Sequence, residues 1–245
     1  MRTSERHHLK DNELALAMGR ANTWAARNRR TLTMTAVALA LVAAAAIGVV
    51  TWRNSVDARA RAMLAEAMVI QEARVVPPAP PVDATTPPPA PQPGTYPSEK
   101  AKLEAALPKL LAAADAYPST DAGLTARYHA AAALVGLGRF DEAVQQYDRV
   151  IRDESGLLSQ MARLGKAEAE LRAGKYDAAI ASFKELSERT DVNVPKEALL
   201  LELARAYRLA GKNEDARKTL TQIVEQHAES PFATEAKAEL AKTKG

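Results

Sequence analysis

One phrase of 14 residues recurs three times in the C-terminal half of this chain. It reads GRFDEAVQQYDRVI from Gly138, GKYDAAIASFKELS from Gly174 and GKNEDARKTLTQIV from Gly211, with glycines 36 and 37 residues apart. Self-similarity at this period is typical of stacked helical hairpins, in which each unit buries its apolar face against its neighbours. The phrase therefore predicts an all-α fold, and such stacks usually serve as surfaces for other proteins.

The apolar positions of the phrase indicate how the hairpins pack. Alanine lies five residues after each glycine, and a large apolar residue lies nine after it. A glycine with φ > 0 can end one helix, an alanine lets two helices approach closely, and the larger residue fills the groove on the same face. We predict that the packing of the repeats depends on Gly138, Ala143, Tyr147, Gly174, Ala179, Phe183, Gly211, Ala216 and Leu220.

A second feature is an apolar run near the N-terminus. Residues 31–50 hold no charge, and Trp24 and Trp52 lie on either side of them. As a helix this run is about 30 Å long, which matches the hydrocarbon layer of a bilayer. We predict a transmembrane helix over 31–51. A buried helix of a soluble protein and a cleaved signal peptide are the alternatives, but the basic leader of about 30 residues is long for a signal peptide.

The distribution of charge predicts the orientation of this span. Residues 1–30 hold seven Lys or Arg against three acidic residues, so the N-terminal tail is expected in the cytoplasm and the C-terminal domain in the periplasm. From residue 98 onward there are 22 Lys or Arg and 23 Asp or Glu. The pI near 9.1 therefore comes from the tail, which faces anionic lipid, and we expect no nucleic-acid partner.

No constellation of catalytic or metal-binding residues is visible. The chain has no cysteine, which removes thiolate chemistry and disulfides. His7 and His8 lie in the basic tail, while His129 and His227 lack the spacing of a zinc site. We expect a protein that is not an enzyme and that holds no cofactor or metal.

Residues 75–97 hold ten of the fourteen prolines, and they separate two helical segments. Proline fixes φ and lacks an N–H, so the segment is expected to be extended, and its 23 residues could reach roughly 70 Å. We interpret it as a semi-rigid linker, with docking of a proline-reading partner as the alternative. Residues 52–74 are expected to form a helical stalk or, packed against residues 98–117, the missing first helix of an earlier repeat.

The spacing of small and large residues resembles the tetratricopeptide repeat over roughly residues 98–243. The resemblance departs from the family pattern where Arg127, Arg163 or Leu200 replaces the first-helix tryptophan, and where Glu170 replaces an apolar residue. It implies an α-solenoid of helical hairpins over 98–245, with the tail from Ser230 as a capping helix.

In the tetratricopeptide family the concave wall comes from the first helix of each pair. Mapped onto this chain, that wall predicts a partner-binding groove of Tyr128, Ala132, Met161, Leu164, Glu168, Leu201, Arg205 and Arg208. The Lys/Asn clamp that some members use to hold a C-terminal carboxylate is missing. An amphipathic or extended apolar segment is therefore the expected ligand, although some of these residues could be packed between helices instead.

The layout of a basic tail (residues 1–30), one span and periplasmic repeats is similar to the YfgM-like inner-membrane proteins, which associate with the Sec translocon and periplasmic chaperones. That resemblance implies a scaffold or holdase accessory to protein export, with translocon subunits or secretory clients as partners. The alternative is an adaptor in assembly of the cell envelope, which the length of the proline segment favours. The small residues Ala40, Ala44 and Gly48 would permit contact between spans, including a homo-oligomer.

Overall fold

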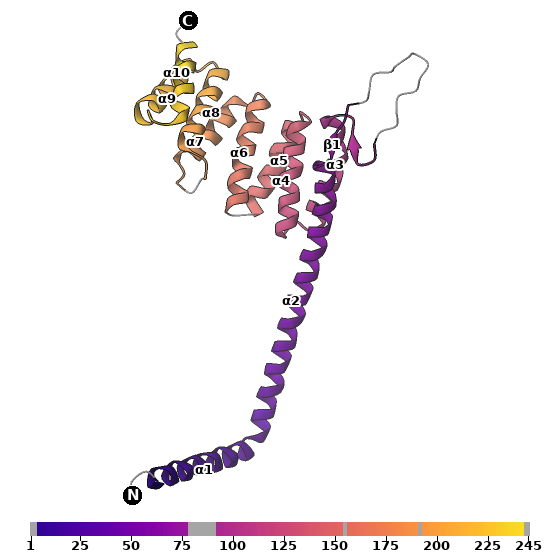
Figure 1. Cartoon of the computed structure of the whole chain (residues 1–245), viewed down its shortest axis with the longest axis vertical. Coiled ribbons are helices and arrows are strands. Elements are labelled where there is room, and N and C mark those ends of the chain that lie inside the picture. The colour runs from indigo at the N-terminus through magenta and orange to yellow at the C-terminus, as the bar shows by residue number, and fades with distance from the viewer. Residues whose placement is uncertain (1–3, 78–91, 154–155, 191–192, 243–245) are drawn as a thin grey trace. The chain divides into compact units, whose positions relative to one another are not determined.

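The structure is a computed structural model that describes residues 4–77, 92–153, 156–190 and 193–242. In this part of the chain it holds ten α-helices and one two-stranded sheet (Figure 1). The chain divides into two units, Met1–Ser55 and Val56–Gly245. The first unit holds α1 (Ser4–Arg27) and the beginning of α2 (Arg29–Gln71), and the second holds the remainder.

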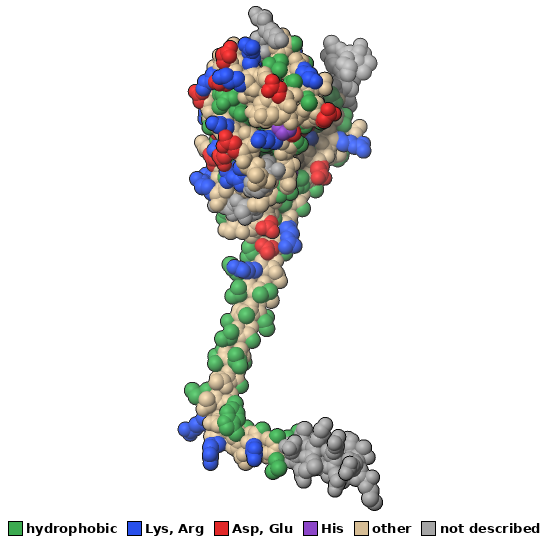
Figure 2. Space-filling model, turned by 90° about the vertical axis from the view of Figure 1, so that its left-hand side faces the viewer, with side chains coloured by type: hydrophobic (Ala, Val, Ile, Leu, Met, Phe, Trp, Pro, Cys, Tyr) green, Lys and Arg blue, Asp and Glu red, His purple; other side chains and the backbone are tan. Residues whose placement is uncertain are grey.

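The first unit contains the predicted membrane span. Helix α2 is long and apolar enough to cross a bilayer, judged by its length and composition alone. All side chains from residue 29 to residue 55 are exposed, so none of the described residues covers its apolar surface (Figure 2). Leu39, for example, is 70% exposed and Trp52 is 66% exposed. Exposed apolar surface of this extent is unfavourable in water and favourable in lipid.

The second unit is a series of antiparallel helical pairs, which Figure 1 shows from magenta to yellow. After the end of α2, its helices are α3 (Glu99–Ala116), α4 (Asp121–Gly136), α5 (Phe140–Asp153), α6 (Leu157–Arg172), α7 (Tyr176–Glu188), α8 (Lys196–Leu209), α9 (Asn213–Gln226) and α10 (Pro231–Lys242). The three phrases found in the sequence begin at the ends of α4, α6 and α8. Each phrase therefore contains the turn and the second helix of a pair.

Left-handed glycines close the first helix of three pairs. Gly138, Gly174 and Gly211 have φ of 74°, 76° and 76°. At the first of these turns the N–H of Arg139 donates to the Leu134 carbonyl at 2.9 Å, and the N–H of Gly138 donates to the Val135 carbonyl at 3.0 Å. The other two turns have the same pair of hydrogen bonds. This is the Schellman arrangement, which satisfies the last carbonyls of the helix and requires a residue that tolerates φ > 0.

The repeat positions form the interior of the second unit. Ala143, Ala179 and Ala216 have no exposed surface, and the large residues four positions later are almost fully buried: Tyr147, Phe183 and Leu220. The buried residues fall into two clusters. Helix α6 contributes to both clusters, so it links the two halves of the array.

The end of α2 packs on α3 as the first helix of a pair would. Ala67 is fully buried, and Met63 and Ile70 pack against the cluster that Ala67 shares with α3. The leucines of α3 in that cluster are Leu103, Leu107 and Leu110. These residues of α2 and α3 thus belong to one core cluster, which is compatible with the hypothesis of a missing first helix.

The two ends of the proline-rich segment, which the sequence predicts to be a semi-rigid linker, lie side by side. Its two ends pair as parallel strands, β1 (Arg74–Val75) and β2 (Thr95–Tyr96), with Arg74 beside Thr95. The N–H of Val76 also donates to the Tyr96 carbonyl at 2.9 Å. Paired strands lie about 4.8 Å apart, so the residues that flank the segment on either side are close together. Its middle, residues 78–91, lies outside the described residues.

A buried arginine replaces the tryptophan of the family pattern in the first repeat. Arg127 is 4% exposed, and its guanidinium donates to the Ala114 carbonyl, to Asp115 Oδ1 and to Gln146 Oε1, each at 2.9 Å. It thereby joins α3, α4 and α5 through three hydrogen bonds. At the equivalent position of the next repeat, Arg163 is partly exposed and reaches Glu185 at 3.2 Å.

The second polar departure from the family pattern is also satisfied. Glu170 is 5% exposed, and Ser182 donates a hydrogen bond to its Oε2 at 2.7 Å. Lys166 Nζ lies 3.8 Å from the other carboxylate oxygen. Helices α6 and α7 are thus joined by a polar contact inside the array, and the carboxylate is not left unpaired, which would be costly at a buried position.

The two arginines at equivalent positions give a matched test of burial. Arg127→Met keeps the apolar stem but leaves the Ala114 carbonyl without its donor, so we expect a loss of about 2–3 kcal/mol of unfolding free energy. Arg163→Met removes only a partly exposed pair and should cost less than about 1 kcal/mol. Urea unfolding of the full chain in detergent, followed by far-UV circular dichroism, measures both. Equal losses would contradict the role assigned to Arg127.

The proline-rich segment, whose two ends pair with each other, should be dispensable for folding. Replacing residues 78–91 with Gly-Ser-Gly-Ser shortens a loop whose ends already meet, so the unfolding free energy should change by less than about 1 kcal/mol. Ala67→Asp is the contrasting variant, because it buries a charge between α2 and α3 and should lower the unfolding midpoint strongly. A large loss of helicity in the shortened chain would show that the segment stabilises the fold.

Candidate partner-binding groove

Two adjoining hollows lie along the first helices in the C-terminal half of the array. One, of about 210 Å³, lies between α8 and α10, with α9 contributing two residues. The other, of about 240 Å³, lies between α6 and α8. Glu202 and Arg205 line both hollows, which therefore form one surface, named here the α6–α8–α10 groove.

Four of the eight predicted wall residues lie in this groove. Leu201, Arg205 and Arg208 line the hollow between α8 and α10, and Glu168 lines the hollow between α6 and α8 together with Arg205. The structure therefore brings together the members contributed by α8 and one member contributed by α6. The other four predicted residues line neither hollow: Tyr128, Ala132, Met161 and Leu164.

Packing between helices explains why two of these four residues lie outside the groove. The Tyr128 ring meets the Tyr147 ring edge-on, with 5.8 Å between centroids and 61° between planes, and Leu164 packs against the second core cluster. Burial raises the pKa of the Tyr128 hydroxyl, and the charge of Glu168 raises it further. Tyr128 and Leu164 thus contribute to the interior between helices, whereas Met161 is 41% exposed and lines neither of the two hollows.

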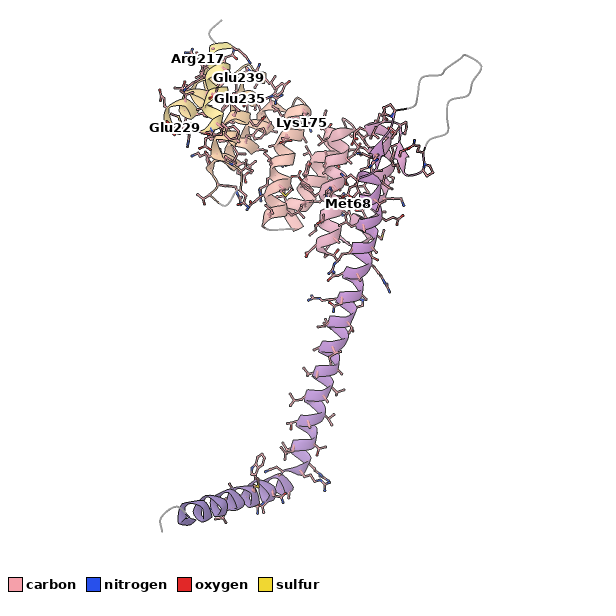
Figure 3. All side chains as sticks on the ribbon, viewed as in Figure 1. Met68, Lys175, Arg217, Glu229, Glu235 and Glu239 are labelled. Carbon is pink, nitrogen blue, oxygen red and sulfur yellow. The ribbon has the colours of Figure 1, made fainter. Side chains whose placement is uncertain are left out.

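The groove also contains residues that the sequence pattern did not single out. Glu202 lies three residues before Arg205, so both fall on one face of α8. Arg172 lies four residues after Glu168, so the same helical spacing predicts that these two residues share a face of α6. Glu235 and Glu239, which Figure 3 shows on α10, were treated only as parts of a capping helix. Leu171 and Leu209 complete the apolar lining.

Like charges meet at the centre of the groove. Burial raises the pKa of the Glu202 carboxyl, and the carboxylates of Glu168 and Glu235 raise it further, whereas Arg205 and Arg172 oppose this effect. Glu202 thus lies in a half-buried place where its charge is only partly compensated. A cation supplied by a bound partner would relieve that repulsion.

The arginines of the groove are held loosely. Arg205 Nη1 lies 3.8 Å from Glu202 Oε2, and Arg208 Nε lies 3.9 Å from Glu239 Oε2. Charge-assisted hydrogen bonds are shorter, about 2.7–2.9 Å. Within the part of the chain that the structure describes, Glu168 and Glu235 form no ion pair. Several charged groups of the groove are therefore available to a ligand.

Two of the glycine turns carry closely paired charges. Lys175 Nζ lies 2.6 Å from Asp141 Oδ1, and Lys212 Nζ lies 2.7 Å from Asp177 Oδ1. Each pair joins the glycine turn of one repeat to the second helix of the preceding repeat. Such exposed pairs contribute little stability, but they leave the turns with satisfied charges. Arg205 and Arg208 of the groove are held less closely than these two lysines.

The histidines do not form a metal site. His227 Nδ1 lies 2.7 Å from Glu197 Oε1 across α8 and α9, and His129 lies edge-on to Tyr128 with 5.6 Å between ring centroids. Burial lowers the pKa of His129. Among the described residues, no three His, Asp or Glu side chains are grouped so that they could hold an ion. His7 and His8 lie where no side chains are described.

Comparison with known proteins identifies the repeats. Residues 128–191 match the tetratricopeptide repeat family, and residues 170–240 match it again. Nearly identical tetratricopeptide-like repeats assigned to a kinesin light chain of Podospora anserina align with 20% identity and a TM-score of 0.49, over 58% of this chain and 77% of that one. A tetratricopeptide repeat protein from Parabacteroides merdae aligns with 18% identity and a TM-score of 0.48, over 60% and 56%. No curated protein matches the chain.

The charge cluster predicts a pH-dependent effect of Glu202→Gln. Because the pKa of Glu202 is higher in the folded chain than in the unfolded chain, its ionisation destabilises the fold at neutral pH. The variant should therefore unfold at a higher urea concentration at pH 7, and this advantage should vanish below the unfolded pKa of about 4.3. Glu225→Gln on the exposed face of α9 is the control and should change neither midpoint. A gain that persists at low pH would contradict the assignment.

Proposed function

We propose that this chain, a tetratricopeptide repeat protein by its matches over residues 128–240, holds a segment of a partner protein in the α6–α8–α10 groove. Tetratricopeptide repeats are scaffolds for protein–protein interaction. The observation that carries the proposal is the shared lining of the two hollows, which joins them into one surface across three first helices. A segment of a partner can lie across such a surface and contact both hollows.

The lining indicates the chemistry of that segment. Leu201 and Leu209 provide apolar surface, and Leu209 is 42% exposed. They lie beside arginines and glutamates on the same helices. An amphipathic helix, or an extended apolar segment with charged residues at its margins, matches this mixture. No bound partner is needed to form the hollows, so little ordering of the protein would accompany binding.

We further propose that the repeats are exported and tethered to the inner membrane by α2. Two features support this: the exposed apolar run of α2, and the excess of basic residues on its N-terminal side. By the positive-inside rule the N-terminal tail is cytoplasmic and the repeats are periplasmic. The layout is similar to YfgM-like proteins, so an accessory role in protein export, with secretory clients or the translocon as partners, is the function proposed.

The alternative role in envelope assembly loses the observation that favoured it. That role depended on a spacer carrying the repeats away from the membrane. Because β1 and β2 bring the ends of the proline-rich segment together, the segment supplies no such reach. No other described feature favours the alternative.

A photo-crosslinking residue in place of Leu201 tests the groove in living cells. Leu201 lines the hollow between α8 and α10, so we expect crosslinked adducts with partner proteins, identified by mass spectrometry. Arg205→Glu in the same background reverses one groove charge and should reduce the adducts several-fold. Translocon subunits or secretory proteins among the adducts would agree with the role in export.

The control position is Thr221 on α9, which lines neither hollow of the groove. It should give few adducts, and Arg205→Glu should not change them. Equal adducts from Thr221 and Leu201 would contradict the groove as the binding surface. Adducts from Leu201 that consist only of wall or outer-membrane assembly proteins would reject the role in export.

A further inference from the structure

Helix α1 presents unpartnered apolar side chains immediately before the predicted span. Among its described side chains, residues 16–27, none is buried. Met18 is 65% exposed and Trp24 is 60% exposed. Aromatic and long apolar side chains of this size are favoured where they leave water. No described part of the chain covers them, so their partner lies outside it.

The apolar and the basic side chains of α1 lie on different sides of the helix. Met18, Ala21 and Ala25 recur at three and four residues, so they lie along one strip of the helix, with Trp24 at its edge. Arg20 and Arg27, seven residues apart, lie on the neighbouring side; Trp24 is four residues after Arg20 and three before Arg27, so its ring lies between the arginines and the strip. Leu16 lies beside Arg20 and is not part of the apolar strip. An apolar strip bordered by basic residues, with an aromatic ring between them, is typical of a helix that lies in a membrane interface.

The charge around α1 has one sign. No acidic residue occurs between Glu13 and Asp57, whereas Arg20, Arg27 and the Arg29–Arg30 pair fall within eleven positions. Anionic headgroups attract basic residues near the membrane by about 1 kcal/mol each. An acidic protein surface is less suitable, because α1 is held beside the bilayer by the span that follows it.

The junction with α2 allows a change of direction. Helix α1 ends at Arg27 and α2 begins at Arg29 (Figure 1). Between them, the side-chain amide of Asn28 donates to the Trp24 carbonyl at 3.1 Å, and the N–H of Asn28 donates to the same carbonyl at 3.0 Å. A side chain that enters the backbone hydrogen-bond ladder is a known cause of helix bending.

We infer that residues 16–27 of α1 lie flat in the headgroup layer of an anionic membrane, with Met18 and Trp24 toward the acyl chains and Arg20 and Arg27 at the lipid phosphates. The inference rests on the proposed anchor, since α2 must be inserted for α1 to reach the surface. The basic tail then binds the membrane surface, in addition to setting the topology of the span. A helix that instead continued straight out would place residue 18 about 20 Å beyond the start of the apolar run.

Tryptophan fluorescence distinguishes these arrangements, because Trp24 and Trp52 are the chain's two tryptophans. In the full chain, Trp24→Phe and Trp52→Phe with Met18→Trp leave one reporter on the apolar strip. The chain is reconstituted into vesicles of phosphatidylcholine alone, or of phosphatidylcholine with phosphatidylglycerol. In the anionic vesicles we expect blue-shifted emission, quenching by brominated lipid and protection from aqueous iodide.

Removing the basic side should release the helix. Arg20→Gln with Arg27→Gln should shift the equilibrium toward water by about 30-fold in anionic vesicles, at about 1 kcal/mol for each arginine. Arg59→Gln with Arg61→Gln removes the same charge beyond the span and should change nothing. Emission typical of water at position 18 in both kinds of vesicle would overturn the inference. Protection from iodide without quenching by brominated lipid would also overturn it, since a protein would then cover the strip.

A separate reporter shows whether the anchor itself is inserted. In the Trp24→Phe chain, Trp52 should be quenched by brominated lipid in both kinds of vesicle. If Trp52 is quenched and position 18 is in water, the surface helix is wrong and the anchor stands. If Trp52 is not quenched and the chain does not float with vesicles, the anchor and the inference both fail.

Discussion

The packing of the array depends on three backbone turns in which glycine takes a left-handed conformation. Because φ is nearly the same at Gly138, Gly174 and Gly211, each second helix leaves its turn in the same direction. The alanine five residues later then always faces the preceding helix, and the fully buried Ala143, Ala179 and Ala216 result from this. A larger side chain at these points would separate the helices and disturb the neighbouring pair as well. Close approach, repeated at each pair, is what allows a chain without cysteine to hold a preformed groove.

The same reasoning explains which features could be predicted from the sequence. Turn glycines and packing alanines are set by local geometry, so spacing alone locates them. The groove could be predicted only in part. Leu201, Arg205 and Arg208 line it, whereas Tyr128 lies against Tyr147. Which wall residues stay open to a ligand depends on the distance between neighbouring helices. That distance is set by the side chains that separate the helices, which spacing in the sequence does not give. The proline-rich segment shows a similar limit. Its composition predicts extended chain, but the pairing of its ends follows from the packing of α2 on α3, a contact between segments far apart in sequence.

The polar departures from the family pattern have a different origin. Arg127 replaces a large apolar residue, yet its guanidinium meets three acceptors on α3 and α5. Buried charges of this kind contribute less to stability than apolar packing of the same volume. Their directional hydrogen bonds can instead favour one register of α3 over others. Helix α3 needs such a constraint more than the other second helices, because a long insertion, and no tight glycine turn, joins it to α2.

Rigid packing and weakly paired charges occur together in the α6–α8–α10 groove, the proposed binding surface. The glycine turns pair their lysines with the preceding repeat at 2.6 and 2.7 Å, so those charges are already satisfied. In the groove, Glu202 is flanked by like charges, and the nearest arginine contact is 3.8 Å long. A ligand at the turns would have to break existing pairs, whereas a ligand in the groove replaces weak contacts with stronger ones. Because the first helices are held in place by the alanine core, this gain is not offset by ordering of the protein. The proposed binding along α6, α8 and α10 therefore depends more on these weakly paired charges than on shape.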